Sequence, residues 1–451
     1  MKDVEYNFIC LLIMQSSVFN QTVPAEGCEL LFNTLSGSIV ELEAPLMQIV
    51  KESPVATQVL LRNGHCVQAG TTVEQEYAAF FAKRTAPTSV LNVLLTITTK
   101  CNLSCEYCFE NRITRRTMTP ATLAQTLKFL EQRCKHINAQ RLRVSIFGGE
   151  PFLEPQLILW SLTGLREVCD RCGIILDPIQ VVTNGMHADP NLLDQLMREG
   201  VSRVQVTFDG AKAIHDKRRQ YRAGIQRSSY DDALSNLPVY AERFQLAVKL
   251  NFDPSTIEHV EPLLDDLIGG GRLEPHVFLI KPEAIQPYRN SQPQSLFFST
   301  NSTDNAVAFK GIIDMCNIRN IRLDLSAVFP TPCMLTQPNS ILIEPDGSIR
   351  SCISAFGMAK FHVGDVKSGL NKANDRVSVT TNFDTSDITK CISKACAFLP
   401  VCNGGCKYEL AVRRKPIESM LCRQDYFDAV LPLYVRTVHA QSSRRLRLGI
   451  P

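Results

Sequence analysis

The sequence predicts an α/β fold: a parallel sheet in the middle of the chain, a small α+β domain before it and a cysteine-rich segment after it. Strand-like and helix-like segments alternate from Val90 to about Glu283 at the spacing of βαβ units. The first 84 residues carry a hairpin signal followed by short helical runs. Beyond residue 330, cysteines recur at close spacing. These three observations define the predicted organisation.

The composition is that of a globular protein that can bury a core, with 451 residues of which 45% are hydrophobic. A net charge of +3 does not predict a nucleic-acid or membrane partner, and we interpret the basic residues 444–451 as a solvated tail. Residues 8–14 are too short to span a membrane, and the nearby Asp3 and Glu5 do not suit a signal peptide, so we expect a cytoplasmic protein. In a reducing cytosol, 17 cysteines indicate metal sites rather than disulfides.

The N-terminal segment, residues 1–84, is predicted to be a separate domain. Its three cysteines lack clustered spacing and are interpreted as small core residues: Cys10, Cys28 and Cys66. The predicted elements are strands 29–33 and 38–42 around a turn at 34–37, a helix from Pro45, and helical runs 55–62 and 73–84. Residues 85–89 form a plausible linker.

Six strands are predicted in the middle segment, residues 90–285. The first, Val90–Thr98, is a continuous apolar and β-branched run typical of a buried parallel strand. The others are 141–147, 179–182, 204–208, 249–252 and 277–281. Because active sites of α/β proteins lie at the carboxyl ends of such strands, the residues that follow each strand are the candidate site.

Three cysteines follow the first strand in a C-x3-C-x2-C run: Cys101, Cys105 and Cys108. Three thiolates in one loop can hold three irons of a cubane cluster and leave the fourth iron without a protein ligand. The aromatic residues Tyr107 and Phe109 are expected to exclude water. A structural zinc site with a distant fourth ligand, or unrelated buried thiols, are the alternatives.

The cysteine loop, with an aromatic residue at position 107, resembles the cluster loop of the radical S-adenosylmethionine superfamily. The resemblance implies a partial (β/α)6 TIM-like barrel whose open iron chelates the amino and carboxylate groups of S-adenosyl-L-methionine. One electron from the 4Fe-4S cluster then cleaves the sulfonium to give methionine and a 5′-deoxyadenosyl radical.

The second strand ends in Gly148-Gly149-Glu150, in which two glycines allow close backbone approach and Glu150 offers a carboxylate for an ammonium group. Such a turn alone is common, but here it resembles the family motif that binds the methionyl amino group. Thr183-Asn184 follows the next strand and by resemblance contributes to the cofactor site.

Asp209 follows the fourth strand and by resemblance lies near ribose or substrate. By themselves, the Thr183-Asn184-Gly185 and Asp209-Gly210 sequences are ordinary turns. Asp209 and His215 are candidate catalytic residues, and polar capping is the alternative role of His215.

Seven further cysteines follow residue 330, and their spacing resembles the SPASM domain with its two auxiliary 4Fe-4S clusters. A hairpin of strands 341–343 and 348–351 is predicted to present Cys352, and Gly404-Gly405 to reverse the backbone. A pair of zinc ribbons is the alternative. By the family pattern the first cluster would take Cys333, Cys352 and Cys406, and the second Cys391, Cys396, Cys402 and Cys422.

The pattern departs from the family at two points. Position 393 is Ser where a cysteine is usual, so Cys391 becomes the first ligand of the second cluster. The first cluster has three thiolates, so either Cys316 is its fourth ligand or the site is open to a substrate thiolate. An open site would suit an enzyme that forms thioethers.

We predict an oxidoreductase that matures a ribosomally made peptide through a thioether or carbon-carbon crosslink. Formylglycine formation in sulfatases is an alternative, but Cys352 is followed by Ile353 and not by the expected aspartate base. A non-catalytic iron-sulfur carrier or regulator is the alternative of another class. The predicted partners are a precursor peptide with a leader and a reductant such as flavodoxin or ferredoxin.

The predicted domain boundaries follow from these segments. The N-terminal domain resembles winged-helix-like leader-binding modules, with mere packing on the barrel as the alternative. Residues 286–330 connect the barrel to the auxiliary-cluster domain, and a boundary at 287–300 precedes a helix at 305–316. The cluster domain spans 331–425, and a helix with the basic tail spans 426–451.

Overall fold

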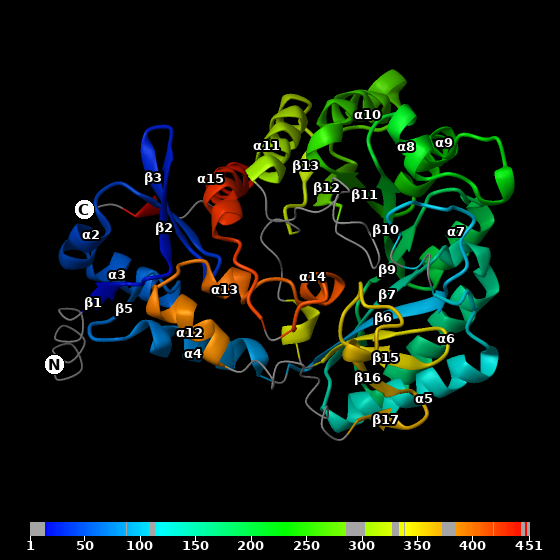
Figure 1. The fold of residues 1–451 in the computed structure, drawn as a ribbon, viewed down its shortest axis with the longest axis horizontal. Helices are drawn as coiled ribbons and strands as arrows, with labels where there is room; N and C mark the ends of the chain where they lie inside the picture. Colours follow the sequence, from blue (N-terminus) through cyan, green and yellow to red (C-terminus); the bar gives the residue numbers. More distant parts are fainter. Residues whose placement is uncertain are drawn as a thin grey trace.

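The computed structural model describes residues 14–86, 88–108, 110, 113–285, 303–326, 333–337, 339–371, 385–417, 419–442 and 447–448. Cys10, Phe109, the predicted boundary at 287–300 and most of the basic tail lie outside these ranges. Figure 1 shows a small N-terminal lobe and a larger lobe built on a sheet, with the C-terminal helix α15 (Gln424–Gln441) between them.

All six predicted parallel strands are present, and they are consecutive neighbours in one sheet. They are β6 (Val90–Thr98), β7 (Arg141–Gly148), β9 (Ile179–Thr183), β10 (Val201–Phe208), β11 (Gln245–Phe252) and β12 (Phe278–Ala284). Two short strands pair in parallel beside them, β8 (Ile175–Leu176) with β7 and β13 (Arg322–Leu323) with β12. The closure of this sheet into a partial barrel stays a prediction.

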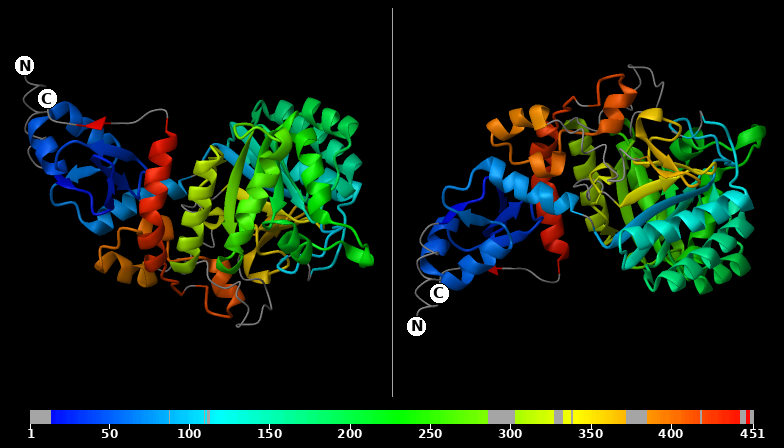
Figure 2. Two further views of the ribbon diagram at one scale, coloured as in Figure 1. Left: turned by 90° about the horizontal axis from the view of Figure 1, so that it is seen from above. Right: turned by 90° about the horizontal axis from the view of Figure 1, so that it is seen from below.

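Helices connect the strands and pack on the sheet (Figure 2). They are α5 (Pro120–His136), α6 (Pro155–Cys172), α7 (Pro190–Arg198), α8 (Lys212–Arg218), α9 (Ser229–Ala241) and α10 (Val260–Ile268). Local sequence explains several of their ends: Thr119 caps α5 ahead of a proline, and Gly173 ends α6 in a left-handed conformation. The buried strand residues pack into one continuous core with these helices, and each such aliphatic side chain contributes about 1.5–3 kcal/mol.

The cysteine-rich segment continues the same sheet at the other edge. The predicted hairpin is confirmed as β14 (Ser340–Ile343) and β15 (Ser348–Arg350), an antiparallel pair. The sequence did not predict that β14 pairs in parallel with β6, nor that β16 (His362–Asp365) and β17 (Gly369–Leu370) extend the sheet. The segment that carries Cys352 is therefore built directly onto the first strand of the parallel sheet.

The N-terminal lobe is a meander of β2 (Asn20–Ala25), β3 (Cys28–Asn33) and β4 (Ile39–Leu42), with a separate pair of β1 (Met14–Ser16) and β5 (Cys66–Gln68). Strands β3 and β4 and the predicted helices are confirmed, as α2 (Leu46–Glu52), α3 (Pro54–Arg62) and α4 (Val73–Thr85). Strand β2 was missed because Pro24 and its polar residues weaken the strand pattern. Cys66 is buried and Cys28 packs at the edge of the core, as predicted.

The basic tail differs from the prediction. Residues Arg447–Leu448 form β18, which pairs in parallel with β4 of the N-terminal meander, so this part of the tail is not simply solvated. Helix α15 packs on β2 and β3, with Tyr434 against Phe32 at 5.9 Å between ring centroids. The predicted helix at 305–316 is confirmed as α11 (Thr303–Ile318), which packs on α15. No helix in the described ranges is long and apolar enough to cross a membrane.

Candidate functional site

The cysteine loop begins where β6 ends, and its three thiols lie within electrostatic reach of one another. Burial raises the pKa of the Cys101 thiol to about 12, with a further rise from the charge of Glu150. Burial also raises the pKa of Cys105, where the charge of Arg219 opposes the rise. Burial raises the pKa of Cys108 as well, and Glu110 and the other two thiols of the loop add to that rise. Buried thiols of this kind stay protonated in the free protein, and a bound metal would displace their protons.

A strap formed by residues 218–222 holds the cysteine loop from outside. Their backbones pair: Ser104 N donates to Gln220 O at 2.7 Å, Glu106 N to Arg218 O at 3.1 Å, and Arg222 N to Asn102 O at 2.9 Å. The strap is anchored in turn by a buried ion pair of Arg218 with Asp253, whose side chains are 7% and 4% exposed. Because Asp253 directly follows β11, the loop is tied through the strap to the end of a strand that lies far from it in sequence.

The glycine pair after β7 lies directly against the start of the cysteine loop. Gly149 N donates to Thr98 O at 2.9 Å, and the amide of Glu150 donates to Lys100 O at 2.8 Å. A Cβ on Gly148 would lie 2.2 Å from Thr98 O, and one on Gly149 would lie 2.2 Å from Lys100 O. Both positions therefore require glycine for close backbone approach, as predicted.

Glu150 is fully buried and its carboxylate joins two strand ends. Its Oε1 accepts from Phe152 N at 3.0 Å and from Thr183 Oγ1 at 2.9 Å, and its Oε2 accepts from Asn184 N at 2.7 Å. Burial raises the pKa of Glu150 to about 7 despite these hydrogen bonds. A carboxylate has about four acceptor positions, and these three hydrogen bonds use three of them. One acceptor position of Glu150 is therefore left for the ammonium group of a ligand.

Asn184 links the end of β9 to the cysteine loop. Its Nδ2 donates to Asn102 Oδ1 at 2.7 Å and lies 3.8 Å from the Sγ atom of Cys101. The structure thus brings three of the predicted strand ends, those of β6, β7 and β9, into contact with one another.

The Tyr107 hydroxyl is the centre of a buried polar cluster. It donates to Asp209 Oδ1 at 2.7 Å and accepts from Asn251 Nδ2 at 2.9 Å and from Arg219 Nη1 at 3.0 Å. Burial raises the pKa of Asp209, opposed by the charge of Arg219. Burial would lower the pKa of Arg219, but Cys105, Tyr107 and Asp209 together hold it well above its ordinary value.

Two atoms of this cluster have no hydrogen-bond partner among the described residues: Oδ2 of Asp209 and Nε of Arg219. Both side chains are at most 7% exposed. A buried acceptor and a buried cationic donor side by side, next to the cysteine loop, suit a polar ligand that carries both a hydroxyl and a carboxylate.

His215 lies apart from this cluster, with its ring packed on Phe208 and Tyr230 at centroid distances of 5.1 and 5.5 Å. Neither ring nitrogen has a hydrogen-bond partner among the described residues, so the capping interpretation is wrong. Burial, and then Arg219, lower the pKa of His215 well below its usual value. A fully buried neutral ring in an aromatic cluster indicates a packing role rather than a catalytic one.

The C-terminal cysteines separate into two groups. Cys352 is buried, and after burial itself the thiols of Cys333 and Cys406 raise its pKa. Burial and then the thiols of Cys396, Cys402 and Cys422 raise the pKa of Cys391 to about 11. These two groups have the same members as the two ligand sets that the family pattern implies.

Cys316 does not join the first group. It lies in α11 within the hydrophobic core and is fully buried, and its only charged neighbour of note is Arg319. It would have to leave the core to serve as a ligand, so the proposal that Cys316 is a fourth ligand has no support.

The sulfur spacing bears on zinc as an alternative. In the described part of the chain, no three His, Cys, Asp or Glu side chains lie close enough together to hold one metal ion. Zinc ligands converge on a single ion at about 2.3 Å, whereas the ligands of a cubane cluster bind separate irons and lie farther apart. Donor sets made of thiols alone suit iron-sulfur clusters, and zinc stays the alternative for them.

Glycines 404 and 405 both have left-handed backbones, with φ of 77° and 89°. A Cβ on Gly405 would lie 2.4 Å from Leu421 O, so this reversal brings the Cys402–Cys406 segment against the residues that precede Cys422. Arg423 acts electrostatically on both Cys402 and Cys406 and therefore lies near both groups.

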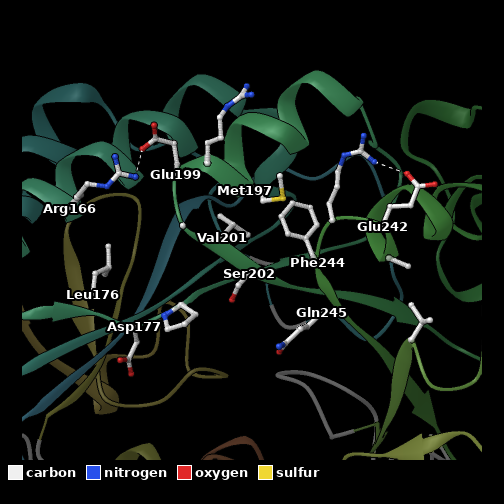
Figure 3. Close-up of a pocket in the computed structure, with 16 residues that line it drawn as sticks. Arg166, Leu176, Asp177, Met197, Glu199, Val201, Ser202, Glu242, Phe244 and Gln245 are labelled. Atoms are coloured by element: carbon white, nitrogen blue, oxygen red, sulfur yellow. Dashed lines mark hydrogen bonds and ion pairs between the residues drawn. The ribbon is translucent and has the colours of Figure 1, made fainter.

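One open hollow on the molecule lies away from this site. It measures about 920 Å³ and is open to solvent. Figure 3 shows Arg166, Glu199 and Phe244 among its lining residues. Its residues precede β9, β10, β11 and β12, so it lies at the opposite ends of the strands from the cysteine loop.

Comparison with known proteins supports the assignment that the site suggests. The model of the radical SAM superfamily matches residues 95–267, which include the cysteine loop and the strand ends β6 to β11. The chain contains a radical SAM domain. The match covers the residues that hold the buried cluster around Tyr107, and a radical SAM domain implies a 4Fe-4S cluster and S-adenosylmethionine.

Two curated proteins are similar to this chain over most of their length. The cysteine-type anaerobic sulfatase-maturating enzyme of Clostridium novyi is 23% identical over 337 residues, which are 68% of this chain and 85% of that protein. The PqqA peptide cyclase of Gluconobacter oxydans is 25% identical over 289 residues, 60% of this chain and 72% of that protein.

Solved structures share the fold. Native anSMEcpe with bound AdoMet and the Kp18Cys peptide superposes with a TM-score of 0.58 at 16% identity, over 78% of this chain and 99% of that one. Streptococcus suis SuiB bound to precursor peptide SuiA superposes with a TM-score of 0.54 at 15% identity, over 92% of this chain and 99% of that one. The SuiB likeness therefore extends beyond the radical SAM domain.

Three residues of the site were not found from the sequence: Arg219, Asn251 and the strap anchor Asp253. The available signal was the basic run Arg218-Arg219-x-x-Arg222, which a charge count assigns to a solvated face. Only the three-dimensional pairing of the strap with the cysteine loop shows that this run is buried at the site.

Proposed function

We propose that this radical SAM enzyme modifies a ribosomally made precursor peptide, through a thioether or a carbon-carbon crosslink. The observation that carries the proposal is the pair of separate thiol groups beyond the radical SAM domain, of which the first, in the part of the chain that the structure describes, brings together Cys333, Cys352 and Cys406. The names of the relatives support a peptide substrate: one is a peptide cyclase, and SuiB is seen with its precursor peptide.

In this proposal Cys101, Cys105 and Cys108 hold a 4Fe-4S cluster and the strand ends hold S-adenosylmethionine. A cluster bound there would supply the electron that cleaves S-adenosylmethionine to methionine and the 5′-deoxyadenosyl radical. The last acceptor position of Glu150 suits the methionyl ammonium, and Arg219 suits its carboxylate through the unpartnered Nε. Oδ2 of Asp209 suits a ribose hydroxyl.

The thiols of Cys333, Cys352 and Cys406 are proposed to hold an auxiliary cluster with one position left for a substrate thiolate. With Cys316 in the core, no fourth cysteine is near this group among the described residues. The second set, Cys391, Cys396, Cys402 and Cys422, supplies four thiols and is proposed to hold a closed cluster. A reductant such as flavodoxin or ferredoxin is the proposed electron donor.

The N-terminal lobe, residues 1–84, is proposed to bind the leader of the precursor. Its described strands and helices form a compact unit on which α15 packs. The second thiol group lies against this lobe, since Tyr77 OH donates to Asn403 Oδ1 at 2.7 Å and Thr34 Oγ1 donates to Ala397 O. A leader bound there would be tethered close to the auxiliary sites.

The first experiment measures 5′-deoxyadenosine. The protein is purified and reconstituted without oxygen, and then incubated with dithionite and S-adenosylmethionine. We expect 5′-deoxyadenosine from the wild type and none from Cys105→Ala, with Cys66→Ala as a control for a buried cysteine outside the site. A Cys105→Ala variant that still produces it contradicts the assignment of the loop.

The second experiment identifies the product. The short peptide encoded beside the gene is coexpressed with the enzyme and analysed by mass spectrometry after alkylation with iodoacetamide. A thioether removes two hydrogens and one alkylatable thiol, whereas a carbon-carbon crosslink removes two hydrogens and keeps every thiol. Formylglycine would instead appear as a carbonyl that reacts with hydrazine, and that product would support the sulfatase alternative.

A further inference from the structure

The sheet of the N-terminal lobe has two outer strands, and only one of them is suited to take a further strand. The outer strand β2 carries Pro24, which lacks an amide donor, and Pro24 O accepts from Arg436 Nη1 of α15 at 3.2 Å. These features block a regular ladder along β2. The other outer strand, β4, has the sequence IVEL, without proline or lysine.

The edge of β4 is occupied by the C-terminal end of the same chain. Arg447 pairs in register with Glu41, and Leu448 with Leu42, in a parallel arrangement. Figure 1 shows this short red strand beside the blue N-terminal lobe, on the far side from the parallel sheet. An edge that accepts an extended segment from more than 400 residues away can accept a strand from a peptide by the same main-chain hydrogen bonds.

The tail is a short and weakly held strand. It pairs with β4 over two residues only. Each hydrogen bond contributes about 0.5–1.5 kcal/mol net, so pairing of the tail with β4 contributes a few kcal/mol of binding free energy at most. Its tether keeps it near the edge: α15 ends at Gln441, and His439 in its last turn lies 3.3 Å from the Glu41 carboxylate. A short linker gives an effective concentration of about 1 mM, so a weak strand can remain bound.

A longer strand would gain more at this edge than the tail does. Strand β4 has four residues, of which Val40 and Leu42 pack with α2 and α3 in one apolar cluster. Side chains of an added strand alternate between the two faces, so every second one would extend this apolar face. A peptide that pairs along all of β4 would therefore displace the tail.

We propose that the C-terminal segment at Arg447–Leu448 is an intramolecular competitor for the β4 edge, where the precursor peptide pairs as an added strand. This inference rests on the proposed peptide substrate and adds a regulatory element to it. If the tail occupies the edge nine-tenths of the time, the apparent affinity for the peptide falls about tenfold.

The first test requires neither a bound iron-sulfur cluster nor catalytic turnover. Amide hydrogen exchange of residues 39–42 is compared in the full chain, in a variant that ends at Ser442, and in Leu448→Pro. Leu448→Val, which keeps the amide donor, is the matched control. We expect faster exchange in the truncated and Leu448→Pro proteins, and exchange equal to the full chain in Leu448→Val. Equal exchange in all four proteins would overturn the proposal.

The second test uses the precursor peptide that is modified in the coexpression experiment. Its dissociation constant is measured by fluorescence anisotropy with the full chain, the truncated protein and Leu448→Val. We expect about tenfold tighter binding to the truncated protein and unchanged formation of 5′-deoxyadenosine without peptide. Equal affinity for all three proteins refutes competition. If the protein fails to cleave S-adenosylmethionine, the proposed function fails while the exchange result still stands.

Discussion

Substitution of Gly149 by alanine tests whether close contact between β7 and the cysteine loop sets the radical-forming site. The new Cβ would lie 2.2 Å from Lys100 O and 2.7 Å from Lys100 C, and both atoms are rigid backbone. Since real Cβ contacts are not shorter than 3.0 Å, the loop must move away by at least 0.8 Å. Overpacking of this kind costs about 1–3 kcal/mol.

The displacement matters more for chemistry than for stability. Catalytic groups must be held within about 0.5 Å, and a misplacement of about 1 Å can cost about 100-fold in rate. We therefore expect Gly149→Ala to lower 5′-deoxyadenosine formation about 100-fold while the fold persists in circular dichroism. Gly269→Ala is the matched control, because Gly269 has open space and a negative φ. Wild-type activity in Gly149→Ala would refute the reasoning.

Three further predictions follow from buried groups. Arg218→Met leaves Asp253 buried without its ion pair and should lower the free energy of unfolding of the apo-protein by about 3–5 kcal/mol, measured by urea denaturation; an Arg218→Met/Asp253→Leu double variant should regain part of it. Cys316→Ala should leave iron content unchanged, whereas Cys406→Ala should remove about four irons per chain, measured after anaerobic reconstitution; iron loss in the first variant would restore Cys316 as a ligand. Burial lowers the pKa of His65 from 6.5 to about 4, so the neutral form stabilises the fold above pH 6.5 and up to about 3 kcal/mol is lost as the pH falls from 6.5 towards 4; His65→Gln should flatten this loss in pH-dependent denaturation, and an unchanged slope would contradict it.

The sequence predicted what depends on local pattern. The strand Val90–Thr98 was predicted with its observed bounds because a continuous apolar run bounded by polar residues has one simple interpretation. The sequence predicted that Gly148 and Gly149 allow a close approach of the backbone. The structure gives the reason, because a Cβ atom at either position would lie 2.2 Å from a backbone oxygen of the neighbouring segment. The thiols that the family pattern assigns to each C-terminal set also act on one another electrostatically, and their role as cluster ligands stays a prediction.

What the sequence could not predict depends on contacts between distant segments. The strap reaches the cysteine loop across more than 100 residues, and nothing in Arg218 or Arg219 marks them as buried. The pairing of β14 with β6 and of β18 with β4 also joins segments that are hundreds of residues apart. For His215, the neighbouring polar residues suggested a cap, but the packing of Phe208 and Tyr230 decides its environment.

The contact between the two cysteine-bearing segments supports the proposal that the first C-terminal thiol group takes part in determining the product. The segment after Cys352 packs on the loop after Cys108: Phe356 lies 6.3 Å from Phe147 at the end of β7, and a Cβ on Gly357 would lie 3.1 Å from the Ile113 side chain. Since β14 is also hydrogen-bonded to β6, the cysteine loop and Cys352 both follow strands of one sheet. Under the proposed function, a radical formed at the cysteine loop would meet a substrate sulfur held at the first group at a set separation, and that separation would select which carbon of the peptide reacts.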